Sequence, residues 1–320
     1  MKTGIVGAGS IGLWIAGRLA DSGLEPNVLA RGKTLKNISR DGITIHSADG
    51  QISAMVNASD DAQALGEQDL VIFAVKGHDL PAAAKAAAGM IGPQTLILPA
   101  MNGVPWWFLE TAPGALAGQP LKTIDPQGTC RELLPAGRVI GGVVHASCKV
   151  AEPGTIQHVM GNGLIIGGAT GPMTELTTVS GLLSNAGFDV TVSNDIRYDI
   201  WYKLWGNMTM NPMSALTGAT CDLILDDPDA RAFASAVMEE AAAIGTAIGC
   251  EITESPEDRH DVTRKLGAFK TSMLQDAEAG RTLEIGALLE APQEIARMAG
   301  VKTPSLDSLL GLMRVFASAR

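Results

Sequence analysis

A glycine-rich turn at the start of the chain constrains the fold more than any other feature. Gly7, Gly9 and Gly12 form a G-x-G-x-x-G pattern that follows a short apolar run, residues 3–6, and precedes residues 11–21, whose apolar positions have helical spacing. The first glycine permits the tight turn, the second lets backbone approach a pyrophosphate, and the third lets the helix pack on the strand. The helix amino terminus offers N–H groups and a positive dipole end to phosphates. We therefore predict a dinucleotide-binding turn made of Gly7, Ala8, Gly9, Ser10, Ile11 and Gly12.

The segments after this turn alternate between strand and helix patterns. Residues 27–30 and 95–98 are strand-like, residues 70–75 are a continuous apolar run typical of a strand buried on both faces, and residues 80–90 suit a helix. This order predicts an α/β, Rossmann-type dinucleotide-binding domain with a parallel sheet and right-handed crossovers. Further expected elements are strands at 139–149, 155–158, 163–167 and 189–192 and a helix at 172–186.

The pattern changes after Asn194. Four long segments with helical periodicity follow, at residues 196–210, 229–248, 255–275 and 283–298, with almost no strand signal. A length of 320 residues also fits two domains better than one. We predict a Rossmann-type domain at 1–194 and an all-α substrate and catalytic domain at 195–320, with residues 105–137 forming a helix and an irregular connection.

Charge and cysteine usage limit the partners and the compartment. The formal net charge of −10 argues against a nucleic-acid or anionic-membrane surface. The four cysteines are scattered without a C-x-x-C pair, no apolar run approaches the about 20 residues that span a bilayer, and the five histidines have no metal-site spacing. We expect a cytoplasmic protein without a signal peptide and without a metal, and the apolar helical domain makes a homodimer plausible.

The residues after the second strand indicate which dinucleotide is bound. Proteins that bind NAD usually place Asp or Glu there to bond the ribose 2′-hydroxyl. Here Arg31 stands in that region, and its guanidinium suits a 2′-phosphate. Lys76, after the apolar run 70–75, adds a second cation at the same rim. These residues favour NADP over NAD, whereas solvated surface charges are the alternative interpretation.

A polar stripe lies on the first helix of the second domain. Lys203, Asn207 and Asn211 recur at i, i+4 and i+8, so one helix face presents an ammonium and two carboxamides. Ile200, Leu204 and Met208 follow the same period on an adjacent face and are expected to anchor the helix. Pro212 is expected to end or kink it after Asn211. The spacing alone leaves a functional face and an ordinary solvent-exposed face equally open.

The motifs together resemble the ketopantoate reductase, or 2-dehydropantoate 2-reductase, family. The resemblance runs through the whole chain in order: the glycine turn, Met101-Asn102-Gly103, Lys203-x3-Asn207-x3-Asn211-Pro212, and Ser272-Met-Leu-Gln-Asp276 followed by Glu284. Gly280 separates Ser272 from Glu284, so we expect these two residues on different helices.

The resemblance implies a role for each matched residue. Lys203 corresponds to the general acid that protonates the ketone oxygen, and Glu284 to the acid near the nicotinamide ribose and the catalytic lysine. Asn102 corresponds to a contact with both cofactor and substrate. The matched substrate-binding residues are Asn207, Asn211 and Ser272, and a weaker match in His145-Ala146-Ser147 places Ser147 beside the cofactor.

Two departures from the family pattern bear on the substrate. A further substrate-facing asparagine, ten residues after the second one, is replaced here by Cys221, and the loop after Asn102 carries the bulky run Pro105-Trp106-Trp107-Phe108. The expected activity is NADPH-dependent reduction of a 2-keto acid, foremost ketopantoate to D-pantoate in pantothenate biosynthesis. The alternatives are a paralogue that acts on a bulkier or aromatic 2-keto acid and a non-catalytic protein that senses NADP.

Overall fold

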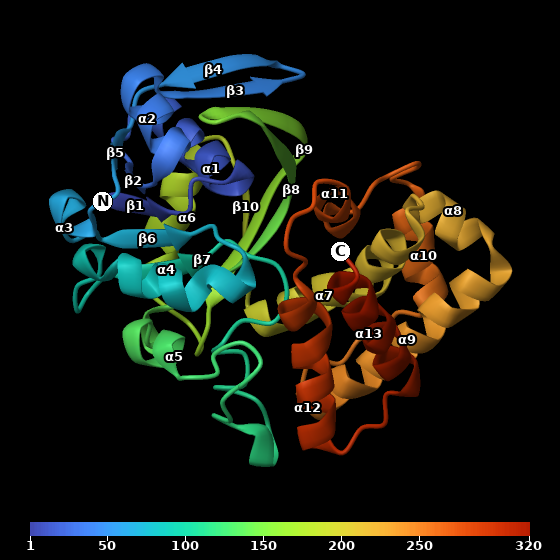
Figure 1. Cartoon of the computed structure of the whole chain (residues 1–320). Helices are drawn as coiled ribbons and strands as arrows, with labels where there is room; N and C mark the ends of the chain where they lie inside the picture. Colours follow the sequence, from blue (N-terminus) through green and yellow to red (C-terminus); the bar gives the residue numbers. More distant parts are fainter. The chain divides into compact units, whose positions relative to one another are not determined.

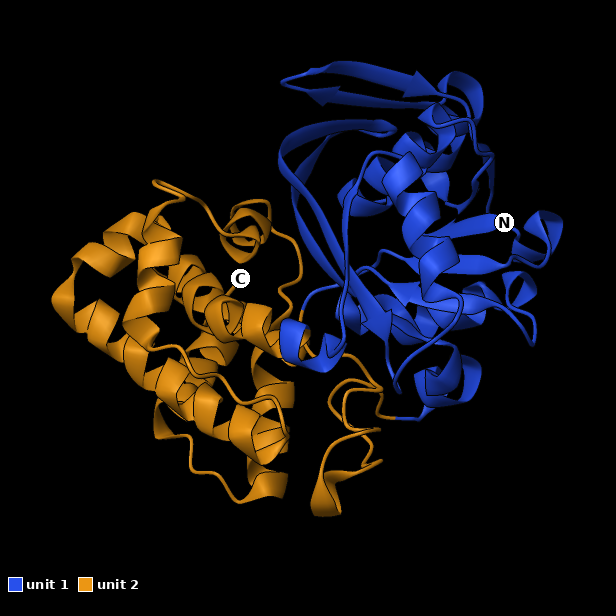
Figure 2. Ribbon diagram, turned by 180° about the vertical axis from the view of Figure 1, so that it is seen from behind, with its two compact units in different colours: residues 1–102, 127–199 blue, residues 103–126, 200–320 orange.

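The computed structural model describes residues 1–320, and the chain divides into two compact units (Figure 2). Unit 1 contains Met1–Asn102 and Gln127–Asp199, and unit 2 contains Gly103–Pro126 and Ile200–Arg320. The division therefore differs from the expected one in two ways. It falls after Asp199 rather than after residue 194, and it assigns residues 103–126 to the helical unit.

A five-stranded sheet forms the centre of unit 1 (Figure 1). Every neighbouring pair in it is parallel. The strands lie in the order β5 (Asn57–Ser59), β2 (Asn27–Leu29), β1 (Thr3–Val6), β6 (Leu70–Phe73) and β7 (Leu96–Pro99). Successive strands extend from β1 in one direction as far as β5 and then in the other direction from β6, so the strand order reverses at β1. In open α/β sheets, ligands bind at the carboxyl ends of the strands at this reversal.

The apolar sequence of the central strands explains their place in the sheet. All residues of β1, β6 and β7 are buried, as expected for strands with helices or another layer on both faces. The Rossmann-type prediction is confirmed. The helices that accompany this sheet are α1 (Ser10–Asp21), α2 (Gly32–Asp41), α3 (Ala62–Leu65), η1 (Gly77–Asp79), α4 (Leu80–Ala86), η2 (Ala88–Met90), α5 (Thr129–Leu133) and η4 (Ala136–Arg138).

A second sheet completes unit 1 with α6 (Leu176–Asn185). Its order is β10 (Asp189–Val192), β9 (Thr155–Gly168), β3 (Ile43–Ser47) and β4 (Gly50–Ala54), and β8 (Ile140–Glu152) pairs antiparallel with β9. The two strands expected at 155–158 and 163–167 are one continuous strand, because β9 keeps pairing with β8 across register shifts near Gly161. The β3–β4 hairpin had no clear sequence signal, since most of β4 is half-buried or exposed and lacks an apolar run.

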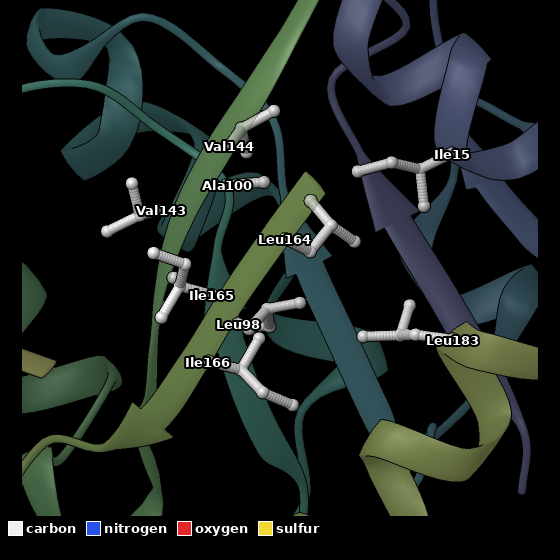
Figure 3. Close-up of a pocket in the computed structure, with 10 residues that line it drawn as sticks. Ile15, Leu98, Ala100, Val143, Val144, Leu164, Ile165, Ile166 and Leu183 are labelled. Atoms are coloured by element: carbon white, nitrogen blue, oxygen red, sulfur yellow. The ribbon is translucent and has the colours of Figure 1, made fainter. Parts of the chain in front are cut away.

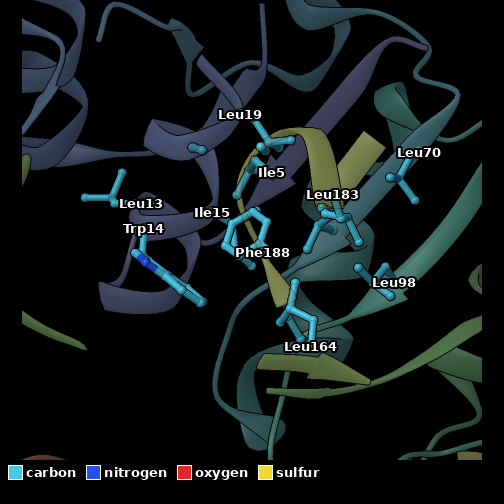
Figure 4. Close-up of a cluster of buried hydrophobic side chains, with 14 of the residues drawn as sticks. Ile5, Leu13, Trp14, Ile15, Leu19, Leu70, Leu98, Leu164, Leu183 and Phe188 are labelled. Carbon is cyan, nitrogen blue, oxygen red and sulfur yellow. The ribbon is translucent and has the colours of Figure 1, made fainter. Parts of the chain in front are cut away.

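The main apolar core of unit 1 joins α1 to both sheets (Figure 4). Trp14 of α1 is fully buried, stacks on His158 at 5.4 Å between ring centroids, and meets Phe188 edge-on at 4.9 Å. A small cavity in the same region is lined only by aliphatic side chains and one glycine, including Ile15, Leu98 and Leu164 (Figure 3). It offers no polar group to a dinucleotide or keto acid, so we interpret it as imperfect core packing.

Unit 2 is helical. Its elements are η3 (Gly114–Leu116), α7 (Ile196–Thr217, from Ile200 onward), α8 (Cys221–Asp226), α9 (Pro228–Ala247), α10 (Pro256–Arg264), α11 (Ser272–Glu278), the π-helical turn η5 (Gly286–Glu290), α12 (Ala291–Ala299) and α13 (Pro304–Ser318). The α/β fold followed by an all-α region is thus as predicted. The helix expected at 255–275 is two helices, because backbone hydrogen bonds of a turn around Gly267 replace the helical pattern between α10 and α11.

Pro212 does not end α7, contrary to the expectation that the helix could stop after Asn211. The helix continues to Thr217 with Pro212 inside it. Proline removes one backbone donor and strains the preceding turn, yet it is tolerated when tertiary packing holds the helix. Pro212 and the residues on both sides of it are buried, and this packing outweighs the local penalty.

Residues 103–126 belong to unit 2 because their side chains and backbone are used there. Phe108 stacks on Trp201 of α7, with ring centroids 5.9 Å apart. The N–H of Val104 donates to the carbonyl of Ala287 at 3.0 Å. Glu294 of α12 accepts from the N–H groups of Lys122 and Thr123, both at 2.9 Å.

None of the helices has both the length and the hydropathy that a membrane span requires.

Candidate active site

The three glycines of the turn after β1 differ in their steric surroundings. Gly7 has φ +105°, and a Cβ there would lie 2.6 Å from the carbonyl oxygen of Ala74. A Cβ on Gly12 would lie 1.9 Å from the carbonyl oxygen of Gly7, so only glycine lets α1 approach the strand. A Cβ on Gly9 would meet nothing within 4 Å. The turn therefore needs glycine at its first and last positions for packing and leaves open space at the middle one.

The same turn ends at the amino terminus of α1. Gly9 is the N-cap, no side chain caps the helix, and the first turn contains no acidic residue. The backbone donors there suit an anion. Because β1 is also where the strand order reverses, the turn lies where this fold class binds its ligands. These observations fit the pyrophosphate of a dinucleotide.

Two predicted cofactor residues, Arg31 and Lys76, follow the strands on either side of β1. Val6 of β1 pairs with Leu29 of β2 on one side and with Phe73 of β6 on the other. Arg31 is exposed two residues after β2, where it is the N-cap of α2, and Lys76 is half-buried three residues after β6.

Asn102 and Ser147 occupy different places in unit 1. Asn102 is half-buried three residues after β7, so it follows a strand at the same edge as Arg31 and Lys76. Ser147 is half-buried on β8 of the second sheet, between two register shifts, and therefore does not belong to that edge.

In unit 2, two indoles fix α7 against α9. Trp201 donates its Nε1 hydrogen to the carbonyl of Ala241 at 3.2 Å, and Trp205, one turn later, donates to the carbonyl of Met238 at 2.8 Å. Ile200, Leu204 and Met208 are buried on this helix as expected from their spacing. The indoles and the aliphatic face together set the rotation of α7 about its own axis.

That rotation determines where the polar stripe lies. Because α7 is continuous, Lys203, Asn207 and Asn211 share one face. Lys203 and Asn207 are half-buried, and Asn211 is 6% exposed. Neither carboxamide makes a hydrogen bond within the chain. Their donors and acceptors are therefore free to bind a ligand.

The Lys203 ammonium has a strongly lowered pKa. Burial lowers its pKa, Glu284 opposes this shift, Arg259 adds to it, and the resulting pKa is about 8. Glu284 itself is 8% exposed. A lysine with a pKa near neutrality can give up a proton in a reaction and regain it from water.

The sequence analysis did not predict Arg259 as a residue of the site. It comes from α10, its Cζ lies 5.3 Å from the ring centroid of Tyr202, and a Cβ on Gly206 would lie 2.9 Å from its Nε. The one available signal was Gly206 itself. A glycine within a helix is less stable than alanine by about 1 kcal/mol, so a close approach at that position is a common reason for it.

Ser272 and Glu284 lie in separate elements of unit 2, as expected. Ser272 is exposed at the first position of α11, after the capping residue Thr271. Gly280, with φ +65°, ends the turn that follows α11. Glu284 precedes η5 and accepts the N–H of Leu288 with its backbone carbonyl at 3.2 Å. The structure brings no three His, Cys, Asp or Glu side chains together as a metal site.

The chain matches two family models and a full-length relative. The family model described as "Ketopantoate reductase PanE/ApbA" matches residues 3–171, and that described as "Ketopantoate reductase PanE/ApbA C terminal" matches residues 195–317. The 2-dehydropantoate 2-reductase of Mesorhizobium japonicum is 39% identical over 100% of this chain and 99% of its own length.

Solved structures extend the comparison to the fold. A proposed ketopantoate reductase from Ralstonia solanacearum has a TM-score of 0.96 at 48% identity, covering 100% of this chain and 98% of its own. D-Mandelate dehydrogenase with NADH and anilino(oxo)acetate has a TM-score of 0.85 at 18% identity, covering 100% and 99%, and shares the fold alone. On the family matches and the full-length relative, the chain belongs to the ketopantoate reductase family.

Proposed function

We propose that the protein reduces a 2-keto acid to a 2-hydroxy acid with NADPH, and that its substrate is ketopantoate, which becomes D-pantoate in pantothenate biosynthesis. The observation that carries the proposal is the half-buried Lys203, whose pKa is lowered to about 8 on a helix face that also presents two unbonded carboxamides. Family membership and the name of the M. japonicum relative support the substrate.

The residues of this chain would act on the carbonyl oxygen and hold the rest of the substrate. NADPH, when bound, would supply a hydride for the carbonyl carbon, and Lys203 would face the negative charge that develops on the oxygen. Lys203 donates its Nζ proton to that oxygen, which gives the hydroxyl group and a neutral amine that regains a proton from water. Asn207 and Asn211 offer N–H donors and carbonyl acceptors to the substrate, and Ser272 offers a hydroxyl group.

Glu284 would orient the ammonium rather than activate it. Its charge raises the pKa of Lys203 and so keeps the amine protonated, the form in which it is an acid. A carboxylate also limits the positions that a flexible ammonium occupies.

The residues of unit 1 suit NADP as the cofactor. The open Gly9 and the uncapped start of α1 would hold the pyrophosphate, with Gly7, Ala8, Ser10, Ile11 and Gly12 completing the turn. Arg31 and Lys76 would bind the 2′-phosphate, because cations and not an acid follow the neighbouring strands. Asn102 and Ser147 are proposed as further cofactor contacts, and Asn102 also as a substrate contact.

The burial of the aromatic run supports ketopantoate over a bulkier substrate. Trp106, Trp107 and Phe108 are all 5% exposed or less and are part of the core of unit 2. They therefore do not indicate an enlarged pocket. Cys221 is buried too, and burial raises the pKa of its thiol to about 11, so it contributes a small neutral group in place of the missing asparagine. We retain a cytoplasmic location and a homodimer as proposals.

An assay of NADPH consumption with a panel of aliphatic and aromatic 2-keto acids tests the function. We expect turnover with ketopantoate and a fall in kcat of about 10²–10⁴-fold in Lys203→Ala, the usual contribution of a general acid. The exposed Lys265 is the matched control, and Lys265→Ala should retain the rate. Turnover with aromatic keto acids alone would identify the paralogue, and tight NADPH binding without any turnover would identify a sensor.

A further inference from the structure

Arg259 is half-buried and lacks the hydrogen-bond partners that such a guanidinium normally has. Its Nε is fully buried without an acceptor, and Glu254 acts on it through charge without forming an ion pair. Arg264, the other arginine of α10, is bound to Asp226 at 2.7 Å and to the carbonyl of Leu225 at 2.7 Å. A desolvated cation without hydrogen bonds is costly, so an unpaired one in a folded protein indicates an absent anionic partner.

The guanidinium is nevertheless held in place. It lies over the ring of Tyr202, with Cζ 5.3 Å from the centroid, which is a cation–π contact. Its other side rests on Gly206, where a Cβ would lie 2.9 Å from both Nε and Nη2. The group is therefore positioned by an aromatic ring and by bare backbone, and neither of these uses its N–H donors.

Its position is on the functional face of α7. Gly206 is three residues after Lys203 and next to Asn207, and residues at i, i+3 and i+4 share a helix face. The contact of the guanidinium with Gly206 therefore brings it to the part of α7 that carries Lys203 and Asn207, and its charge acts on Lys203. The charge of Glu284 acts on Lys203, and the charges of Tyr202 and Glu254 act on Arg259. None of these groups accepts a hydrogen bond from the Nε of Arg259, and a ligand carboxylate would supply that acceptor.

We propose that Arg259 is a substrate-binding residue that pairs with the carboxylate of the 2-keto acid. The inference rests on the proposed function. A guanidinium matches a carboxylate with two parallel N–H donors, which a serine hydroxyl cannot do. In a 2-keto acid the carboxylate is bonded to the carbonyl carbon. A cation that holds the carboxylate beside Lys203 therefore also brings the carbonyl oxygen to the ammonium, while Ser272 adds a neutral hydrogen bond.

The test compares a 2-keto acid with its own 2-keto amide, which has the same shape without the charge. In the wild type, kcat/KM for the acid should far exceed that for the amide. Arg259→Gln should reduce kcat/KM for the acid by about 10- to 100-fold, the range for a lost charge-assisted pair. The amide rate should change little, so the discrimination disappears. Arg259→Lys, which keeps the charge but not the fork, should fall between the two.

Two further measurements separate this role from others. Arg264→Gln removes the same charge from α10 and should leave the discrimination intact. Calorimetric titration of the NADP-loaded enzyme with oxamate, an unreactive carboxylate, should show binding in the wild type and weaker binding in Arg259→Gln. Equal losses for acid and amide, unchanged oxamate binding, or a weaker NADPH Kd as the main defect would each overturn the inference. A wild type that reduces no 2-keto acid at all but binds oxamate through Arg259 would contradict the proposed function alone.

Discussion

Glu284 holds the pKa of Lys203 above the value that burial alone would give it. Desolvation is the largest influence on the ammonium and lowers its pKa, and Arg259 acts in the same direction. The result is a pKa of about 8. Burial and two neighbours of opposite charge together set the acidity of the proposed proton donor, and each neighbour can be removed separately.

The alkaline limb of the pH–rate profile should report this balance. The protonated amine is the active acid, so kcat/KM should fall as the pH rises through about 8. Glu284→Gln removes the influence that raises the pKa, so the limb should move to lower pH. Arg259→Gln removes a cation that lowers it, so the limb should move to higher pH.

Both shifts are measured from kcat/KM for the keto acid with saturating NADPH, between about pH 6 and 10. This range extends on both sides of the lowered pKa of Lys203. Arg264→Gln is the control for a general change in net charge and should leave the limb in place. Shifts in the same direction for the Glu284 and Arg259 variants would contradict the proposed arrangement.

The glycine turn offers a pair of substitutions with opposite expected effects. Gly9→Ala has room for its Cβ, and its φ of −87° suits alanine, so the fold should be retained. The methyl group would occupy the open space at the turn, and Kd for NADPH should rise at least about tenfold. Gly12→Ala would clash with the carbonyl of Gly7 and should lower the free energy of unfolding by about 1–3 kcal/mol or more. Chemical denaturation and NADPH fluorescence distinguish the two effects, and equal destabilisation by both would contradict this assignment.

Arg31 should determine the choice between NADPH and NADH. Arg31→Asp places a carboxylate beside the 2′-phosphate, so kcat/KM for NADPH relative to NADH should fall by about 10- to 100-fold. Aspartate is a favoured N-cap residue, and Arg31 is the N-cap of α2, so the substitution should not harm the helix. Lys33→Asp makes the same charge change two residues later, and an equal fall there would show a general effect of net charge.

The residues that sequence analysis located are those whose role depends on local spacing. Gly7 and Gly12 are required by contacts within one strand–turn–helix unit, and Lys203 and Asn211 share a face because they lie on one continuous helix. Within each of these two motifs, the residues that carry the signal are only a few positions apart in the sequence. They therefore predicted the Rossmann-type fold and the polar face of α7.

Features that depend on distant packing were not predictable in the same way. Pro212 carries a local signal to end the helix, and its buried surroundings outweigh that signal. Arg259 is 56 residues after Lys203 in the sequence. Only the fold brings its charge near enough to affect the pKa of Lys203. The assignment of residues 103–126 to unit 2 likewise depends on the contact of Phe108 with Trp201.

Gly206 should be required by the position of Arg259 rather than by the helix. Alanine favours a helix by about 1 kcal/mol over glycine, so Gly206→Ala should not lower the free energy of unfolding. Its Cβ would displace the guanidinium, and KM for the keto acid should rise more than kcat falls. Gly311→Ala on α13, where a Cβ meets nothing within 4 Å, is the control. A reduced stability with unchanged KM would show that Gly206 serves packing only.

Phe108 should affect stability and not substrate choice. Its side chain is fully buried and stacks on Trp201, so Phe108→Ala should lower the free energy of unfolding by about 3–5 kcal/mol, the usual effect of removing a core aromatic ring. Phe108→Leu should lower it less and leave enough folded enzyme for kinetics. In that variant the ratio of kcat/KM for ketopantoate to that for an aromatic 2-keto acid should equal the wild-type ratio, because the residue packs in the core instead of contacting substrate. A shift of this ratio towards the aromatic acid, with stability unchanged, would place Phe108 in the pocket and restore the argument for a bulkier substrate.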